Sequence, residues 1–568
     1  MDRRKFVQNS SLLATLPFIP PIGKLALDKT QKPDWLVRLI LLNDEYLKKL
    51  LPDRIGDPSL ENYGGFINNY QFVNEHSTVA FVKSGITSLV TEESSFYNDS
   101  ELLSKLNDAV LWLLKVQNSD GSINLYSTNF NSPPDTGFFI KWLGPIYKLL
   151  MESDVRNKET LMENLKLFMI RAGNALTVGG IHTPNHRWVV CAALAWLYML
   201  WPDPKYRSRA EQWLAEGIDI DVDGQYHEKS SHVYTPLTDR NLIIIARGFD
   251  KPELLDYVRK NLDMTEYYLH PNGEVITEVS GRQDRARIGT MEGYYFPYRY
   301  LALHDDNQQF AAMCKLIEET AFDKISGPSL HYILEDQSLW KKLPKPSTIP
   351  EEYERYFKDS GLVHIRRGDY DGSIIALSPS FFTFHKMDTA IHGVRLASAF
   401  FGKGQFSSEE LVKDGDSWKL ERDLEGPYYQ PLSEDLVTGE NDWNKTPRNL
   451  RKKTEIQKLK SIVNIREIAN GFELEINIEG TDRVPVTLEL IFRPGGTFSG
   501  LEKLEEEPDS WLLKEGIGTY SNKGSAINFG PGTYGHKWIR LRGALPGEDA
   551  PTAFLTGFTP FRHKIVIS

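Results

Sequence analysis

The sequence predicts a helical domain followed by an antiparallel β-sandwich in a chain of 568 residues. Two observations support this division. Up to about Trp340, apolar residues recur at three- and four-residue intervals, which is typical of amphipathic helices. Beyond a proline-rich segment the period of the apolar residues changes to two, which is typical of strands with one buried face. At this length we expect two large domains rather than one.

The first part of the chain predicts roughly a dozen helices separated by short turns. A long succession of helices, without strands between them and without a strict repeat, favours antiparallel helix pairs arranged as a toroid or a solenoid. Residues 188–201 are apolar on nearly all sides, so we expect an inner helix there. The clearest helical segments are residues 35–51, 101–116, 158–170, 188–200, 206–214 and 253–262.

A change in composition separates the two predicted domains. Three prolines within residues 343–350 predict a linker, which places the helical domain at residues 28–342 and the sandwich at residues 351–568. We expect the domains to share a cleft, with residues 381–385 in its wall. In the predicted strands, apolar and polar residues alternate or a continuous apolar stretch lies between turns rich in Gly, Asp and Asn. These strands include residues 361–367, 373–377, 472–478 and 486–492.

Composition excludes several classes of protein. The 66 Lys and Arg against 77 Asp and Glu give a net charge of −11, which argues against nucleic-acid binding through phosphate contacts. Two cysteines exclude a disulfide framework and a cysteine-rich zinc site. Because no stretch approaches about 20 consecutive apolar residues, we expect no membrane span.

The N-terminus carries an export-like pattern. Arg3 and Arg4 precede Lys5 and Phe6, and a modestly apolar segment follows at residues 12–22. This order is typical of a bacterial twin-arginine signal, which we assign to residues 1–27. The mature protein is then expected in the periplasm or outside the cell.

Two polar segments, residues 179–188 and 223–234, each lead into a predicted helix and could converge at one end of the helical barrel. Asn185 is a good helix N-cap by residue type. His186 falls in the first helical turn, where the helix field favours a neutral imidazole that can act as a base. Tyr234, taken alone, fits a core position as well as a catalytic one.

Together these segments resemble the polysaccharide lyases of the heparinase II/III-like and toroid alginate-lyase type. The resemblance lies in an Asn-His pair opening an inner helix and a Tyr that follows an Asp-Gly…Glu-x-Ser segment. It implies an (α/α) toroid, either an incomplete or a six-hairpin barrel, followed by an antiparallel β-sandwich. It also implies that Asn185, His186 and Tyr234 are catalytic. The substrate contacts implied alongside them are Asn129, Asp135, Arg187, Arg282, Arg285 and His385.

The activity implied by the resemblance is β-elimination in a uronate-containing polysaccharide, which leaves a 4,5-unsaturated uronate. A base removes the C5 proton and an acid protonates the departing O4. Tyr234 can perform both steps in a syn elimination, whereas His186 is the natural base in an anti elimination. No cofactor is required, and a structural divalent metal is left open. His385 and His392 match the sandwich histidines of the family only in part.

Two other classes of function remain open from the sequence. A toroid glycoside hydrolase would need paired carboxylates, for which the chain offers Asp135, Asp223, Glu228 and Asp284. A non-catalytic carbohydrate-binding protein would use the 12 Trp and 25 Tyr as stacking platforms. The identity of the glycan, and endo or exo action, are not fixed by these residues.

Overall fold

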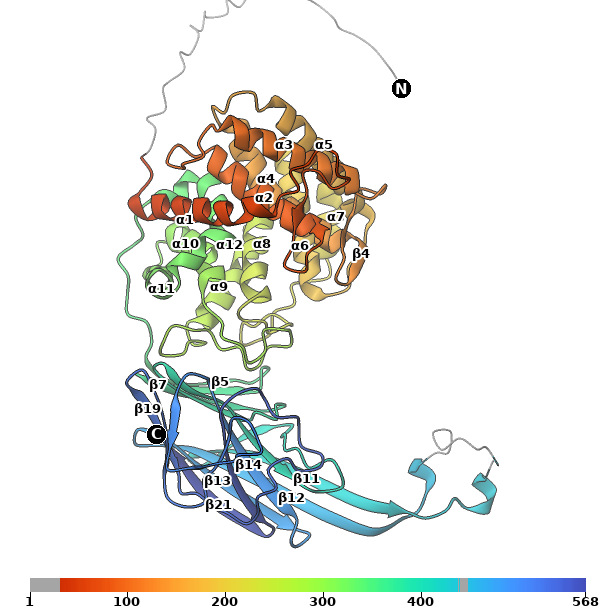
Figure 1. Cartoon of the computed structure of the whole chain (residues 1–568), viewed down its shortest axis with the longest axis vertical. Coiled ribbons are helices and arrows are strands. Elements are labelled where there is room, and N and C mark those ends of the chain that lie inside the picture. Colours follow the sequence, from red (N-terminus) through yellow and green to blue (C-terminus); the bar gives the residue numbers. More distant parts are fainter. Residues whose placement is uncertain (1–30, 438, 440–447) are drawn as a thin grey trace, which may run out of the picture.

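The computed structural model describes residues 31–437, 439 and 448–568. Figure 1 shows these residues as a helical half and a β-sheet half that lie end to end. Helices prevail up to Trp340, and strands prevail from Glu352 onwards. The predicted order of a helical part followed by an antiparallel β part is confirmed. The predicted export signal at residues 1–27 lies outside the described residues.

Twelve α-helices form the helical half within the described residues. Two short hairpins lead into inner helices: β1 (Phe66–Ile67) and β2 (Val73–Asn74) precede α2, and β3 (Ile123–Leu125) and β4 (Asn129–Ser132) precede α4. The helices are α1 (Asp34–Leu50), α2 (Glu75–Leu89), α3 (Ser100–Val116), α4 (Pro133–Glu152), α5 (Glu159–Val178), α6 (Pro184–Leu200), α7 (Pro204–Leu214), α8 (Tyr234–Phe249), α9 (Leu254–Thr265), α10 (Tyr295–His304), α11 (Gln308–Thr320) and α12 (Phe322–Glu335).

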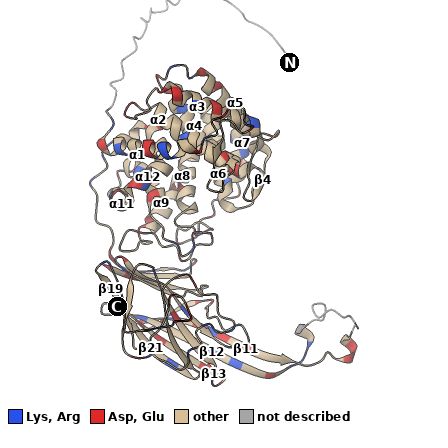
Figure 2. Cartoon of the chain, viewed as in Figure 1, with Lys and Arg blue, Asp and Glu red and all other residues tan. Residues whose placement is uncertain are grey.

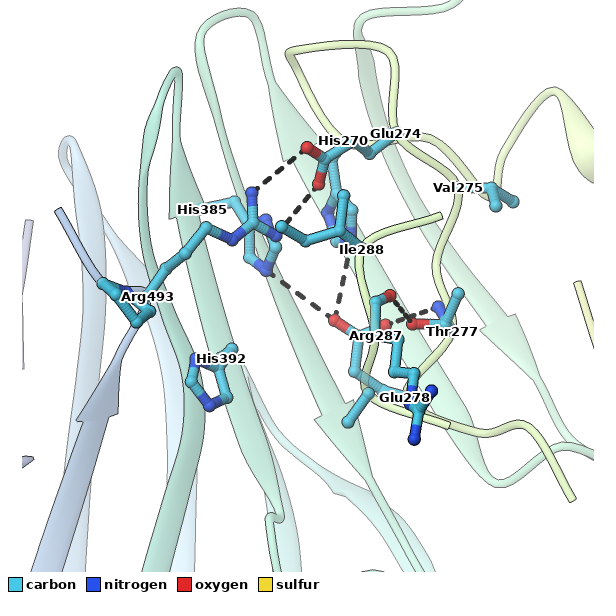
Figure 3. Close-up of a pocket in the computed structure, with 12 residues that line it drawn as sticks. His270, Glu274, Val275, Thr277, Glu278, Arg287, Ile288, His385, His392 and Arg493 are labelled. Carbon is cyan, nitrogen blue, oxygen red and sulfur yellow. Dashed lines mark hydrogen bonds and ion pairs between the residues drawn. The ribbon is translucent and has the colours of Figure 1, made fainter. Parts of the chain in front are cut away.

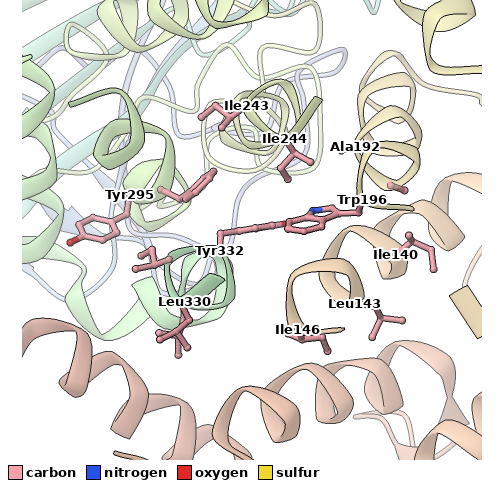
Figure 4. Packing of buried hydrophobic residues seen from close by; sticks show 14 of the residues in the cluster. Ile140, Leu143, Ile146, Ala192, Trp196, Ile243, Ile244, Tyr295, Leu330 and Tyr332 are labelled. Atoms are coloured by element: carbon pink, nitrogen blue, oxygen red, sulfur yellow. The ribbon is translucent and has the colours of Figure 1, made fainter. Parts of the chain in front are cut away.

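Helix α6 is the inner helix that the sequence predicts. Its residues 185–197 are all buried, so neighbouring elements surround it. The neighbours approach closely because they present glycines: a Cβ on Gly144 of α4 would lie 2.4 Å from the ring of Trp196, and one on Gly248 of α8 would lie 2.8 Å from Ala195. Figure 4 shows Trp196 beside Tyr332 in the middle of this apolar core.

The β half contains a nine-stranded and an eight-stranded sheet within the described residues. Neighbouring strands are antiparallel, except that β17 runs parallel to β20. The nine-stranded sheet has the order β16 (Glu502–Lys503), β17 (Ser510–Leu512), β20 (Thr552–Phe558), β14 (Pro485–Phe492), β9 (Thr389–Ser398), β8 (Phe382–Lys386), β7 (Tyr370–Ile375), β6 (Leu362–Arg367) and β5 (Glu352–Phe357). The eight-stranded sheet has the order β10 (Leu411–Asp414), β11 (Ser417–Tyr429), β12 (Lys453–Ile468), β13 (Gly471–Gly480), β21 (Phe561–Ile567), β19 (Ser525–Gly530), β18 (Gly518–Asn522) and β15 (Thr497–Ser499).

Strand β13 shows how the period of two forms the sandwich core. Its side chains at Phe472, Leu474, Ile476 and Ile478 are all buried, and the residues between them are more exposed. Because successive side chains of a strand point to opposite faces, one face of β13 joins the core and the other meets solvent. The strand predicted at residues 472–478 is therefore confirmed.

One face of the nine-stranded sheet packs on the other sheet, and part of its second face meets the helical half. Every residue of β7 is buried. At the junction, Arg493 forms an ion pair of 2.9 Å with Glu274, and His270 contacts Asp371 at 2.8 Å. These contacts join the loop between α9 and α10 to the sheet.

The wall expected at residues 381–385 is only partly formed. Phe381, Phe382 and Phe384 are fully buried in the sandwich core, and β8 directs Phe382 and Phe384 to the same face. His385 of this segment reaches the junction with the helical half, where it lies 3.7 Å from Glu278. Residues 343–350 contain neither helix nor strand. Across the described residues, no helix is long and apolar enough to span a bilayer.

Candidate active site at the mouth of the toroid

The N-termini of four inner helices bring polar side chains together at one end of the helical half, which we call the mouth of the toroid. Helix α2 contributes His76, α4 contributes Asp135, α6 contributes Asn185 with His186, and α8 begins at Tyr234. The first backbone N–H groups of a helix have no partner within the helix and carry a partial positive charge. Helix ends gathered in this way favour an anionic ligand. Figure 2 shows charges of both signs interspersed along both halves, so the mouth does not belong to a single-sign surface.

Asn185 is not the N-cap of α6, which corrects the prediction from its residue type. Thr183 takes the N-cap position and Pro184 the first helical position, where its missing N–H costs nothing. The side chain of Asn185 is therefore free to make another contact. Its Nδ2 donates to both carboxylate oxygens of Glu228, each at 2.8 Å, and reaches the hydroxyl of Thr183 at 3.3 Å. Its Oδ1 is buried without a hydrogen-bond partner.

His186 lies in the first turn of α6 and is only 8% exposed. Burial is the main reason that its pKa falls to about 4, and the nearby ring of His182 acts in the same direction. The two rings meet edge to face, with 4.7 Å between their centroids. His186 is therefore neutral at neutral pH, as predicted, although burial rather than the helix field is the leading cause. Its Nδ1 has no hydrogen-bond partner.

Tyr234 opens α8, and its hydroxyl accepts a hydrogen bond of 2.9 Å from Nε2 of Gln283. Because the bond is donated by Gln283, the hydroxyl proton of Tyr234 remains available for another acceptor. The guanidinium of Arg282 lies over the Tyr234 ring, 5.0 Å from its centroid. The positive charge of Arg282 also contributes to the lowered pKa of His186, after burial and His182. Arg282 is thus near both of the predicted catalytic side chains.

A buried carboxylate holds the loop that carries Arg282 and Gln283. Asp284 accepts hydrogen bonds from the hydroxyls of Ser280 and Ser230, and from the backbone N–H of His232. The Ser230 hydroxyl in turn accepts the backbone N–H of Tyr234 at 3.1 Å. Asp284 therefore fixes the loop against the start of α8. Arg285, which was predicted to contact substrate, is exposed one residue further on.

Asp135 is held by three neighbours at the start of α4. Its Oδ2 accepts from Nδ2 of Asn129 at 3.0 Å and from the hydroxyl of Ser132, and its Oδ1 lies 3.8 Å from Nε2 of His76. Sequence reasoning missed His76. A signal was present, because His76 stands two residues after Asn74, whose side chain caps α2 by accepting from Ser77 N at 2.8 Å. Polar first turns therefore recur on the inner helices.

Arg187 and His385 lie outside this group. The guanidinium of Arg187 is buried, forms an ion pair of 2.8 Å with Asp219 and covers the ring of Trp188 at 4.5 Å. Since its charge is satisfied within the protein, we leave Arg187 out of the substrate contacts proposed below. His385 is buried at the junction between the two halves.

Figure 3 shows the cavity at this junction, which measures about 140 Å³. The rings of His270 and His385 stack face to face with 3.7 Å between centroids. Oε1 of Glu278 lies 3.5 Å from Nε2 of His270 and 3.7 Å from Nε2 of His385, and His392 also lines the cavity. His385 and His392, the partial match offered by the sequence, thus lie here together with His270 from the helical half. His270 and His385 are too far apart in the sequence to form a recognisable motif.

Among the described residues, His270, Glu278 and His385 form the group whose donor atoms lie close enough together to hold a metal ion. A tetrahedral ion with bonds of 2.0–2.1 Å holds its ligand atoms about 3.3–3.4 Å apart. The distances from Glu278 are close to this value and longer than hydrogen bonds. Two imidazoles with one carboxylate form a donor set that Zn²⁺ accepts. His270 would be oriented by Asp371 through its other ring nitrogen, at 2.8 Å.

Comparison with known proteins supports the fold. No protein-family model and no curated protein sequence matches the chain. Among solved structures, heparinase III superposes with a TM-score of 0.55 over 96% of this chain and 86% of its own, at 12% identity. A Paenibacillus xanthan lyase gives 0.57 over 94% of this chain and 56% of its own, at 11% identity. A Streptomyces coelicolor A3 chondroitin AC lyase, solved with chondroitin sulphate, gives 0.53 over 95% and 80%, at 12% identity.

The chain therefore has the fold of the toroid polysaccharide lyases. The similarity extends over both halves, so the order of helical toroid and β-sandwich is shared as well as the separate parts. At these levels of identity the similarity concerns the fold alone. The resemblance seen in the short motifs of the sequence is thus confirmed for the architecture.

Proposed function

We propose that this chain is a polysaccharide lyase that cleaves a uronate-containing glycan by β-elimination. The observation that carries the proposal is the grouping of a neutral His186, the hydroxyl of Tyr234 and the guanidinium of Arg282 at the mouth of the toroid. Elimination needs a base, an acid and a positive charge near the uronate carboxylate. This group offers all three.

The carboxylate of the uronate opposes loss of the C5 proton, because the transition state adds negative charge beside it. In the proposed reaction, Arg282 and the helix N-termini offset that charge. The N–H of Asn185 that reaches Thr183 only at 3.3 Å is the one that turns to the substrate, while Glu228 holds the rest of the amide. Asn129 and Asp135 contribute polar contacts at the edge of the mouth.

The proton transfers are assigned to His186 and Tyr234. The hydroxyl proton of Tyr234 is directed away from Gln283 and is donated to O4 as the bond from C4 to O4 breaks. In an anti elimination, neutral His186 removes the C5 proton from the opposite face. In a syn elimination, Tyr234 performs both transfers and His186 orients the uronate. The product in both cases carries a double bond between C4 and C5.

A glycoside hydrolase at the same mouth is the less favoured reading. Hydrolysis needs one carboxylic acid and one carboxylate that are free to act on the substrate. Asp135 is engaged by Asn129 and Ser132, and both oxygens of Glu228 are engaged by Asn185. The carboxylates at the mouth therefore orient other side chains.

The experiment that tests the proposal is incubation with a panel of uronate polysaccharides, including glycosaminoglycans, alginate and glucuronate-containing plant and bacterial glycans. Elimination creates an unsaturated uronate that absorbs in the near ultraviolet, whereas hydrolysis does not. We expect at least one polymer to give this absorbance. New reducing ends that appear without the absorbance would assign the protein to the hydrolases.

We also propose that the enzyme works in the periplasm or outside the cell, where polysaccharides are encountered. Support comes from Arg3 and Arg4 in an export-like segment. Replacing both by Lys should keep the protein in the cytoplasm when the cell fractions are separated. Unchanged location would reject the twin-arginine route.

A further inference from the structure

Three cationic side chains lie deeper in the toroid than the mouth. They are Lys83 on α2, Lys141 on α4 and Arg240 on α8. Each stands six or seven residues beyond the residue that its helix contributes to the mouth. At a rise of 1.5 Å per residue, this places the Cα atoms of the three residues about 9–10.5 Å further along the inner helices.

Contacts with two neighbours show that the three cations lie close together. The ammonium groups of Lys83 and Lys141 lie 5.3 Å and 5.4 Å from the ring centroid of Trp142. Lys83 donates to the carbonyl of Gly327 at 2.9 Å, and Arg240 donates to the next carbonyl, that of Pro328, at 3.2 Å. Lys83 is therefore near both of the other cations.

The cluster lacks a counter-charge. Among the described residues, none of the three cations forms an ion pair, and Lys141 forms no hydrogen bond through its ammonium although it is only 2% exposed. Nε of Arg240 and Nε2 of His331 are buried without partners. The acids that influence Arg240 are Glu292 and Asp239, and neither is paired with it. The ammonium of Lys141 and Nε of Arg240 are thus donors without an acceptor among the described residues.

The electrostatics agree with this geometry. Burial, followed by repulsion from Arg240, lowers the pKa of Lys83 to about 8. The same causes, with Lys83 added, hold the pKa of Lys141 well below its ordinary value. A buried charge without a partner is costly, so an anion beside these cations would stabilise the folded protein.

One aromatic side chain links the cation cluster to the mouth, and large side chains pack below it. The half-buried ring of Phe138 lies between the two levels: its centroid is 6.3 Å from that of His186 and 4.9 Å from the ammonium of Lys141. Deeper along the helices, Trp196 and Tyr332 are buried and fill the interior, as Figure 4 shows. Because the interior below the cluster is filled, we expect an anion to reach it from the mouth.

We propose that Lys83, Lys141 and Arg240 form an anion subsite that binds an acidic group of the glycan on a sugar other than the cleaved uronate. This inference deepens the proposed function, because the substrate would then carry a carboxylate or a sulfate on a second sugar. A free inorganic oxyanion such as sulfate would bind through the same contacts. The experiments below therefore distinguish a free oxyanion from an acidic group on the glycan.

The first measurement is the melting temperature of the full chain titrated with inorganic sulfate at constant ionic strength. We expect a saturable rise for the wild type, and no saturable rise for Lys141→Met, which keeps the length of the side chain and removes its charge. Because Lys141 is an unpaired buried cation, Lys141→Met should also melt no lower than the wild type without sulfate. The exposed Lys49→Met on α1 is the matched control and should respond like the wild type.

The second measurement uses the polysaccharide that gives unsaturated product. Sulfate should compete with it, and Lys141→Met should raise KM by about tenfold or more with little change in kcat, since it removes a charge-assisted contact remote from the reacting atoms. Lys83→Met should act in the same direction. It provides a second variant should Lys141→Met fail to fold.

The outcomes separate the two proposals. An equal, saturable response of wild type and Lys141→Met to sulfate would overturn the anion subsite. If the rise in melting temperature with sulfate depends on Lys141 but Lys141→Met leaves KM unchanged, the site binds free oxyanions. Binding of an acidic group on the glycan would then be rejected. A Lys141-dependent response in a protein that cleaves no uronate polymer would support the anion site and contradict the lyase.

Discussion

Nδ2 of Asn185 donates to both carboxylate oxygens of Glu228, and this contact fixes the first turn of α6 against the loop that leads into α8. Glu228→Gln keeps the shape of the side chain and removes the charged acceptor. We expect the free energy of unfolding to fall by about 1–3 kcal/mol, because the hydrogen bond to a charged group is lost. Misplacement of Asn185 should slow turnover by about 100-fold.

Urea unfolding and initial rates of elimination measure these two effects. Glu216→Gln is a suitable control, because Glu216 pairs with Arg187 at 3.4 Å and is half exposed. Its unfolding free energy should change by less than about 1 kcal/mol. If Glu228→Gln matched the wild type in both measurements, the contact would have no part in building the site.

Tyr234→Phe tests the proposed acid. The change removes one hydroxyl from the start of α8, so the fold should persist while turnover falls by about two to four orders of magnitude. Tyr226→Phe is the matched control, since the hydroxyl of Tyr226 donates to buried Asp239 at 2.8 Å. That variant should lose stability and keep its rate per folded molecule. Near-normal elimination by folded Tyr234→Phe would remove Tyr234 from the mechanism.

The pH dependence of turnover tests His186. Burial lowers its pKa to about 4, so the neutral base is present throughout the range above about pH 5. If His186 removes the C5 proton, kcat should fall tenfold per unit only below about pH 4, and His186→Gln should abolish that limb together with most of the rate. An acidic limb near pH 6.5 would indicate an exposed histidine instead.

The free energy of unfolding should also depend on pH through His186. A histidine whose pKa is lowered by folding binds a proton more readily in the unfolded chain. The contribution of His186 is therefore fully present above pH 6.5 and declines as the pH falls towards 4. His186→Gln should unfold with a shallower pH dependence than the wild type in this window.

Metal binding tests the cluster at the junction. Zn²⁺ at about 100 times its dissociation constant should stabilise the folded protein by about 2.7 kcal/mol if the ion binds only the folded state. A chelator should reverse the effect, and His385→Ala should abolish it because His385 supplies one of the three donors. Equal responses of wild type and His385→Ala to Zn²⁺ would show that the ion binds elsewhere.

The sequence was sufficient where one local pattern determined the structure. The apolar run of α6 and the alternation of β13 were recognised because burial acts on neighbouring positions of one element. It was insufficient where contacts join distant elements. His270 and Glu278 meet His385 across more than 100 residues, and no local period marks such a meeting. The residue type of Asn185 fits an N-cap, but the helix begins at Pro184 with Thr183 as its N-cap, two residues before the expected position.

The most direct test of the lyase proposal is the mass of the products formed in water enriched in heavy oxygen. Elimination breaks the bond from C4 to O4 without adding water, so we predict products without solvent oxygen at the cleavage point, including one that is lighter by one water than its hydrolytic counterpart. Incorporation of one heavy oxygen atom per cleavage, with no loss of water, would contradict the account and assign the chemistry to hydrolysis.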